Sequence, residues 1–97
     1  MPDYILAYQG RPNISSPEEG QAHMTAWRAW MQGMGTAVKV PGNPCGPSKM
    51  LGGGTPGLAG YTIITATDLA AATAMAEGCP HLNGGSIEVC ELLNMEM

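Results

Sequence analysis

The residues from 59 to 92 constrain the fold more than any other part of the chain. They read as a strand, a helix and a second strand joined by tight turns. Residues 61–66 are mostly β-branched or aromatic, and residues 86–92 alternate apolar and polar side chains, which is typical of half-buried strands. Between them, Thr67 or Asp68 can cap a helix of small and apolar residues. This half of the chain therefore predicts a strand-helix-strand unit.

The first half of the chain repeats the same order. Residues 4–8 predict a short strand, and residues 36–40 predict another. Between them, Ser16 can cap a helix that has Pro17 at its first position and Glu19 placed to complete a capping box. The helical period predicts that one face of this helix carries His23, Met24, Trp27, Trp30, Met31 and Met34.

The two halves are joined by residues 41–57, in which ten of seventeen residues are Gly or Pro, so this segment is a loop and not a helix or strand. The resulting order, β-α-β-β-α-β, predicts one α+β domain over residues 1–97 with the ferredoxin-like fold. Right-handed connections place both helices on one face of a four-stranded antiparallel sheet. The other face is then bare, and we expect a second copy of the chain to cover it in a homodimer.

The composition excludes several classes of protein. The net charge is −4 and only four basic residues are scattered along the chain, which argues against binding nucleic acid or an anionic membrane surface. There is no apolar run near eighteen residues and no signal peptide, so we expect a cytoplasmic protein without a membrane span. The three cysteines lack CxxC spacing and are expected to be reduced, mostly buried thiols.

No cofactor or metal is expected from the motifs. The triglycine at 52–54 is not followed by a Lys-Ser/Thr pair and a helix, as a phosphate-binding loop requires. Cys79 and His81 could supply two metal ligands, but a site needs three or four, and a turn or capping role for His81 is the preferred interpretation.

Four segments in this order resemble the YCII-related family, including its DGPF-type branch. They are a histidine-bearing helix ending MQGMG at 31–35, GNPCGPSK at 42–49, GYTIITATDLAAA at 60–72 and GCPHLNGGSIEV at 78–89. The resemblance covers nearly the whole chain. It implies a small bacterial protein of the dimeric α+β barrel type, with a cleft between the first helix and the sheet edge near the dimer interface.

The resemblance also carries expectations about chemistry. A His–Asp pair has been proposed as acid/base machinery in this family, and a dehydrohalogenating, lyase-like activity has been associated with it. His23 stands at the position of the family's helix-one histidine, whereas residues 36–43 contain no carboxylate where the pattern places an aspartate. Residues 54–57 read Gly-Thr-Pro-Gly in the DGPF region.

Two residues are candidates for catalysis. His23 could act as a proton carrier, because an unperturbed imidazole titrates near neutrality, or it could be a hydrogen-bonded core histidine. Glu88 would point into an open cleft if Ile87 and Val89 face the helices, or it could be a solvated or dimer-paired glutamate. Candidates for substrate binding are Tyr8, Tyr61, Trp27 and Ser48. For the tryptophans a core position is the preferred alternative.

Two functions therefore remain open. The first is an enzyme or binder of a small, anionic or phenolic molecule, working in a cleft of the dimeric barrel with His23 as proton carrier. The second is a non-catalytic dimeric scaffold or accessory or regulatory module, which the missing aspartate favours.

Overall fold

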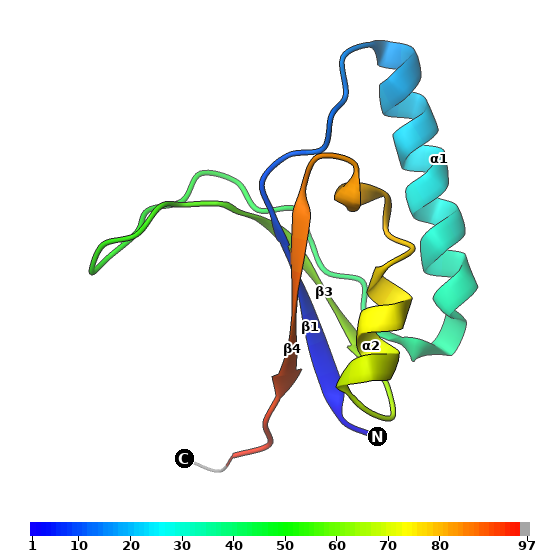
Figure 1. Ribbon diagram of the computed structural model, residues 1–97, viewed down its shortest axis with the longest axis vertical. Helices are drawn as coiled ribbons and strands as arrows, with labels where there is room; N and C mark the ends of the chain where they lie inside the picture. The colour runs from blue at the N-terminus through cyan, green and yellow to red at the C-terminus, as the bar shows by residue number, and fades with distance from the viewer. Residues whose placement is uncertain (96–97) are drawn as a thin grey trace.

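The computed structural model describes residues 1–95 and has the predicted element order (Figure 1). The strands and helices are β1 (Asp3–Gln9), α1 (Pro17–Met34), β2 (Val38–Val40), β3 (Leu58–Thr65), α2 (Leu69–Ala76) and β4 (Ser86–Leu92). Short 3-10 turns precede β2 (η1, Gly35–Ala37) and β4 (η2, Pro80–Leu82). The β-α-β-β-α-β prediction is confirmed.

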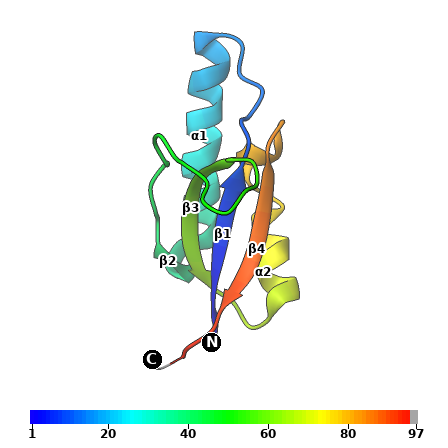
Figure 2. The same cartoon turned by 90° about the vertical axis from the view of Figure 1, so that its left-hand side faces the viewer.

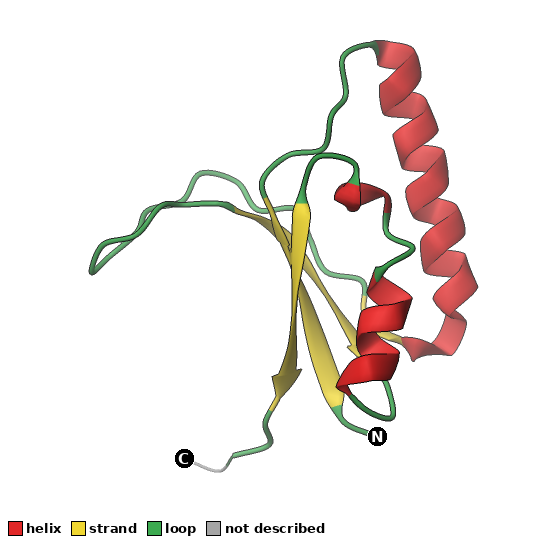
Figure 3. Cartoon of the chain, viewed as in Figure 1, coloured by secondary structure: helices red, strands yellow, loops and turns green. Residues whose placement is uncertain are grey.

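The four strands form one antiparallel sheet in the order β2-β3-β1-β4. In the central row, Leu6 of β1 pairs with Thr62 of β3 and with Val89 of β4. Both helices lie on the same side of this sheet, as the views in Figures 2 and 3 show. The chain is therefore the two-layer, ferredoxin-like fold expected from its sequence.

The core lies between the sheet and α2, whereas α1 stands further from the sheet. Ala72 and Ala76 of α2 are buried, because their small side chains let the helix approach the strands closely. No residue of α1 is buried. Trp30 ties the two helices together, since its indole N–H donates to the carbonyl of Met75 at 2.9 Å. This difference in height leaves space under α1 for a cleft.

The helix caps follow the sequence signals closely. The Ser16 hydroxyl accepts a hydrogen bond from the amide of Glu19 at 3.2 Å, and Asp68, rather than Thr67, caps α2. The capping box differs in one detail, because the Glu19 carboxylate binds the amide and hydroxyl of Ser15 and not the amide of Ser16. The helix start is still fixed by reciprocal bonds.

Two sequence expectations need correction. The thiols are not mostly buried: Cys79, which follows α2, is buried, but Cys45 in the loop and Cys90 on β4 are exposed. The strand expected over residues 36–40 is shorter, because the turn η1 takes up its first residues and β2 begins at Val38.

Within residues 1–95, no helix covers the second face of the sheet (Figure 2). Ile5 and Ile63 pair at its centre and are half-buried, and Cys90 lies beside Ile5 on β4. The loop of residues 41–57 extends away from the sheet on the side opposite the helices (Figure 1). Within residues 1–95, no helix is long and apolar enough to cross a membrane.

Candidate functional site

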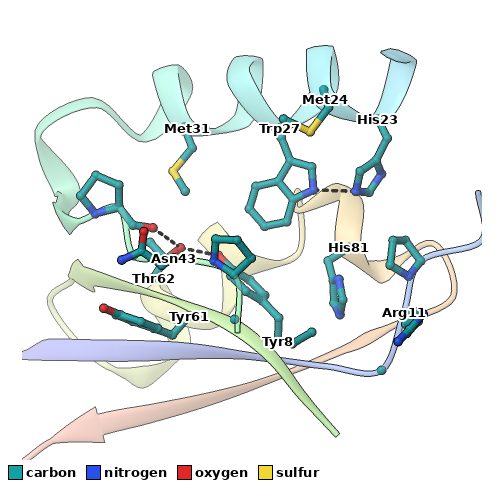
Figure 4. Close-up of a pocket in the computed structure, with 17 residues that line it drawn as sticks. Tyr8, Arg11, His23, Met24, Trp27, Met31, Asn43, Tyr61, Thr62 and His81 are labelled. Carbon is teal, nitrogen blue, oxygen red and sulfur yellow. Dashed lines mark hydrogen bonds between the residues drawn. The ribbon is translucent and has the colours of Figure 1, made fainter. Parts of the chain in front are cut away.

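A cleft of about 520 Å³ lies between α1 and the sheet, closed at one side by the loop that follows β2 (Figure 4). Most of its walls are apolar or aromatic, and they include Tyr8, Pro12, Met24, Trp27, Met31 and Pro44. A volume of this size suits a small organic molecule. The height of α1 above the sheet is what creates the space, since none of its side chains is buried against the strands.

The floor of the cleft is held by a chain of two hydrogen bonds. The Tyr8 hydroxyl donates to Thr62 Oγ1 at 2.6 Å, and the Thr62 hydroxyl donates to the carbonyl of Pro41 at 3.0 Å. These bonds join β1, β3 and the loop after β2. Burial raises the pKa of the Tyr8 phenol above its usual value, so Tyr8 stays protonated and acts here as a donor.

The loop approaches β3 closely because two positions are glycine. Gly42 has a φ of 80°, and a Cβ there would collide with the carbonyl of Tyr61. Gly60 sits opposite, and a Cβ on it would come within 3.0 Å of the Asn43 carbonyl oxygen. Glycine at both positions therefore lets Asn43 and Pro44 form a wall of the cleft.

His23 projects from α1 and is hydrogen-bonded to its neighbour one turn along the helix. The Trp27 indole N–H donates to His23 Nε2 at 2.7 Å. An indole N–H can only donate, so Nε2 carries a lone pair and the proton of the neutral imidazole is on Nδ1. Desolvation and the nearby His81 lower the pKa of His23. A proton on Nε2 would also displace the hydrogen bond from Trp27.

His81 lies in the same cleft, which its sequence position did not predict. It belongs to η2 and is 4% exposed, with its Nε2 at 2.8 Å from the carbonyl oxygen of Gln9. Since a carbonyl only accepts, Nε2 carries the proton in this bond. The ring packs against Tyr8 at 5.4 Å between centroids. His81 therefore lies in a turn, as expected, and also forms part of the cleft wall.

The described residues that line the cleft include a cationic side chain but no acidic one. Arg11, just after β1, contributes the cationic side chain. None of the described lining residues is Asp or Glu. Figure 4 shows Arg11, His81 and His23 toward one end, with Met31 and Tyr61 toward the other. The cleft therefore has a polar end with several nitrogen groups and a more apolar end.

The structure brings together four of the six residues that the sequence proposed for a site. His23, Tyr8, Tyr61 and Trp27 all line the cleft. Trp27 is half-buried, so it serves both as cleft wall and as packing for Tyr8, whose ring it meets edge-on at 5.1 Å. Both Trp27 and Trp30 pack against the core, as preferred from the sequence, and Trp27 also lines the cleft because α1 stands above the sheet.

The other two proposed residues lie elsewhere. Ser48 lines a separate hollow of about 690 Å³ beside the 41–57 loop, which shares Arg11 and Gly10 with the cleft. Glu88 pairs with Ala7 and is exposed on the face of the sheet opposite the cleft, since Ile87 and Val89 face the helices. Within residues 1–95, no three His, Cys, Asp or Glu side chains gather to hold a metal ion.

The sequence signal for the remaining cleft residues was weak. His81 and His23 are the only two histidines of the chain, which is the one feature that could have linked them. Arg11 and Asn43 lie in loops whose conformation depends on contacts far away in sequence. Periodicity describes helices and strands, and these residues are in neither.

Comparison with known proteins identifies a family but no assigned activity. A search of curated proteins and a search of solved structures each found no match. The family model of the YCII-related domain matches residues 2–96, which is essentially the whole chain. Together with the ferredoxin-like sheet and the cleft under α1, this match shows that the chain belongs to the YCII-related domain family.

Proposed function

We propose that the cleft under α1 binds a small organic molecule with an apolar body and an anionic end. Side chains of the cleft then move a proton to or from this molecule. The observation that carries this proposal is the composition of the cleft: aromatic and methionine walls, two histidines, one arginine and no carboxylate among the described lining residues. Acid/base chemistry of this kind is what the family resemblance implies, with a histidine of α1 at its centre.

The shape of the cleft supports a defined orientation of the ligand. An anionic group is favoured near Arg11 and His23, because the guanidinium and the Nδ1–H group of His23 are donors to carboxylates. An aromatic or aliphatic body then lies against Trp27 and Met31, where its burial is favourable by about 25 cal/mol per Å² of apolar surface.

A pair of probes with the same ring and opposite charge tests this binding mode. Phenylacetate and benzylamine have the same ring, so a titration followed by Trp27 fluorescence and amide chemical shifts should show binding of the first and little of the second. Replacing Arg11 with glutamine should weaken phenylacetate binding about two- to fivefold, the effect expected for one exposed ion pair. Equal binding of both probes would contradict the proposal.

We also propose that the protein is a homodimer that pairs through the uncovered face of its sheet. Ile5 and Ile63 lie on this face and are only half-buried in the single chain. A monomer would leave this apolar surface in water, whereas a second sheet would remove it. Sedimentation at micromolar concentration should give twice the chain mass, and Ile63→Lys should return the monomer.

A non-catalytic dimeric scaffold is the second candidate function, and the uncovered face is the observation that favours it. The two candidates differ in the cleft: a scaffold would dimerise but bind neither probe there. We keep the cytoplasmic location as part of either proposal, supported by the three free thiols at Cys45, Cys79 and Cys90, which are typical of reducing compartments.

A further inference from the structure

The two histidines of the cleft are held with their protons on different nitrogens. His23 accepts at Nε2 from Trp27, so its remaining ring nitrogen, Nδ1, is an N–H donor. His81 donates from Nε2 to the Gln9 carbonyl, so its Nδ1 carries the lone pair. One imidazole thus offers a donor to a ligand, and the other offers an acceptor.

The orientation of His81 is fixed by its surroundings. A Cβ on Gly85 would lie within 2.7 Å of His81 Cδ2 and closer still to Nε2, so only glycine fits against this edge of the ring. In the five-membered ring Nδ1 lies opposite the Nε2–Cδ2 bond and therefore points away from Gly85. His81 itself lines the cleft. The lone pair is thus held on the side of the ring that is not engaged by β1 or Gly85.

We propose that His81 is the proton acceptor of the cleft, and that His23 stays neutral and donates a hydrogen bond to the ligand. This inference rests on the proposed function and names the roles of its two histidines. Protonation of His81 at Nδ1 leaves its bond to the Gln9 carbonyl intact, because that bond uses the proton on Nε2. Protonation of His23 at Nε2 would instead break its bond with Trp27.

The electrostatics of the pair favour the same division of roles. A positive charge on His81 disfavours one on His23, whose pKa is already lowered by desolvation and by His81. A neutral His23 that lost its Nδ1 proton would become an imidazolate, which is far too basic to form near neutral pH. His23 is therefore suited to hydrogen-bond a developing oxyanion without giving up its proton.

The ligand class that fits this arrangement is a 2-oxo acid with an apolar side chain. His81 Nδ1 takes a proton from the carbon next to the carbonyl; the C–H bond breaks, and its electron pair moves into the new C–C double bond. The enolate oxygen accepts a hydrogen bond from His23 Nδ1–H, and Arg11 pairs with the carboxylate. Return of the proton from His81 gives the enol or the ketone, so the step needs no oxidant, reductant or second substrate.

Phenylpyruvate in D₂O is the probe for this step. Exchange of its C3 protons for deuterium, followed by proton NMR, should be faster with the protein than in buffer. The same substitution at both histidines separates their roles. His81→Gln can still donate to the Gln9 carbonyl but cannot accept a proton, so the exchange rate should fall at least about 100-fold. His23→Gln retains an N–H donor, and its rate should fall less than about tenfold.

The outcomes are distinguishable from those of the proposed function. A larger loss in His23→Gln than in His81→Gln overturns the assignment, and so does bound phenylpyruvate that exchanges no faster than in buffer, although binding in the cleft would then stand. Failure of phenylpyruvate to bind overturns both. Nitrogen-15 NMR of the free wild-type protein gives an independent check: neutral His81 should be protonated at Nε2 and neutral His23 at Nδ1, and the reverse pattern refutes the inference.

Discussion

Replacing Thr62 with valine tests whether the floor of the cleft depends on its two buried hydrogen bonds. Thr62 is fully buried, accepts from the Tyr8 hydroxyl and donates to the Pro41 carbonyl. Valine has nearly the same shape, so the change removes the hydrogen bonds without opening a cavity. The Tyr8 hydroxyl is then left without its partner in a buried site, whereas Pro41 is exposed and its carbonyl can bind water.

The expected cost follows from these two environments. Leaving the buried Tyr8 hydroxyl unpaired costs about 1–3 kcal/mol, and the exposed Pro41 carbonyl adds less than about 1 kcal/mol. We therefore expect Thr62→Val to lower the free energy of unfolding by about 1–4 kcal/mol. Urea denaturation followed by tryptophan fluorescence, at one fixed protein concentration, measures this change through the midpoint.

Two controls make the measurement specific. Thr65→Val makes the same chemical change on the same strand, but Thr65 faces away from the cleft and is only half-buried, so its cost should be below about 0.5 kcal/mol. Tyr8→Phe combined with Thr62→Val removes both partners, and the double variant should be about 1 kcal/mol more stable than the sum of the single effects predicts. A Thr62→Val protein as stable as Thr65→Val would refute the reasoning.

Three further predictions concern other parts of the site. Trp27→Ala should cost about 2–3 kcal/mol, less than for a fully buried tryptophan, while the exposed Arg28→Ala should cost under about 0.5 kcal/mol; equal midpoints in urea would contradict this. The pKa of His23 is lower in the folded protein than in the unfolded chain, where it is about 6.5. Its contribution to the free energy of unfolding is therefore present above about pH 6.5 and is lost as the pH falls through the pKa of the folded state. Wild type should lose more stability on acidification than His23→Gln. An alkylating reagent at about pH 8 should spare Cys79, because burial raises the pKa of this thiol to about 11. The same reagent should modify the exposed Cys90 more slowly as the protein concentration rises, because the partner's sheet then covers it. A rate at Cys90 that does not depend on protein concentration would refute the sheet-to-sheet dimer.

The order of the elements was determined by local sequence signals. Ser16 and Asp68 cap the two helices because their side chains reach backbone amides within three residues, and such bonds depend on nothing distant. The alternation in β4 likewise assigned Ile87 and Val89 to one face and Glu88 to the other, which the structure confirms. Caps and periodicity act within a few residues, so the sequence alone could specify them.

The composition of the cleft was decided only by the tertiary structure. Periodicity placed His23 on the inner face of its helix, but it could not say that α1 would stand above the sheet and leave Trp27 beside an open space. The bond between His81 and the Gln9 carbonyl spans 72 residues, and the bond between Tyr8 and Thr62 spans 54. Contacts over such separations depend on how the two halves of the chain pack, which no local pattern records.

The packing of the two halves also explains why His81, and not Glu88, lines the cleft. In sequence, Glu88 was the plausible carboxylate for a histidine and His81 was a residue of a turn. Pairing of β4 with β1 puts Glu88 on the face away from α1, and the same pairing brings the turn before β4 against the end of β1. Strand register, which is set by packing of the whole sheet, thus decided which of the two residues reaches the cleft.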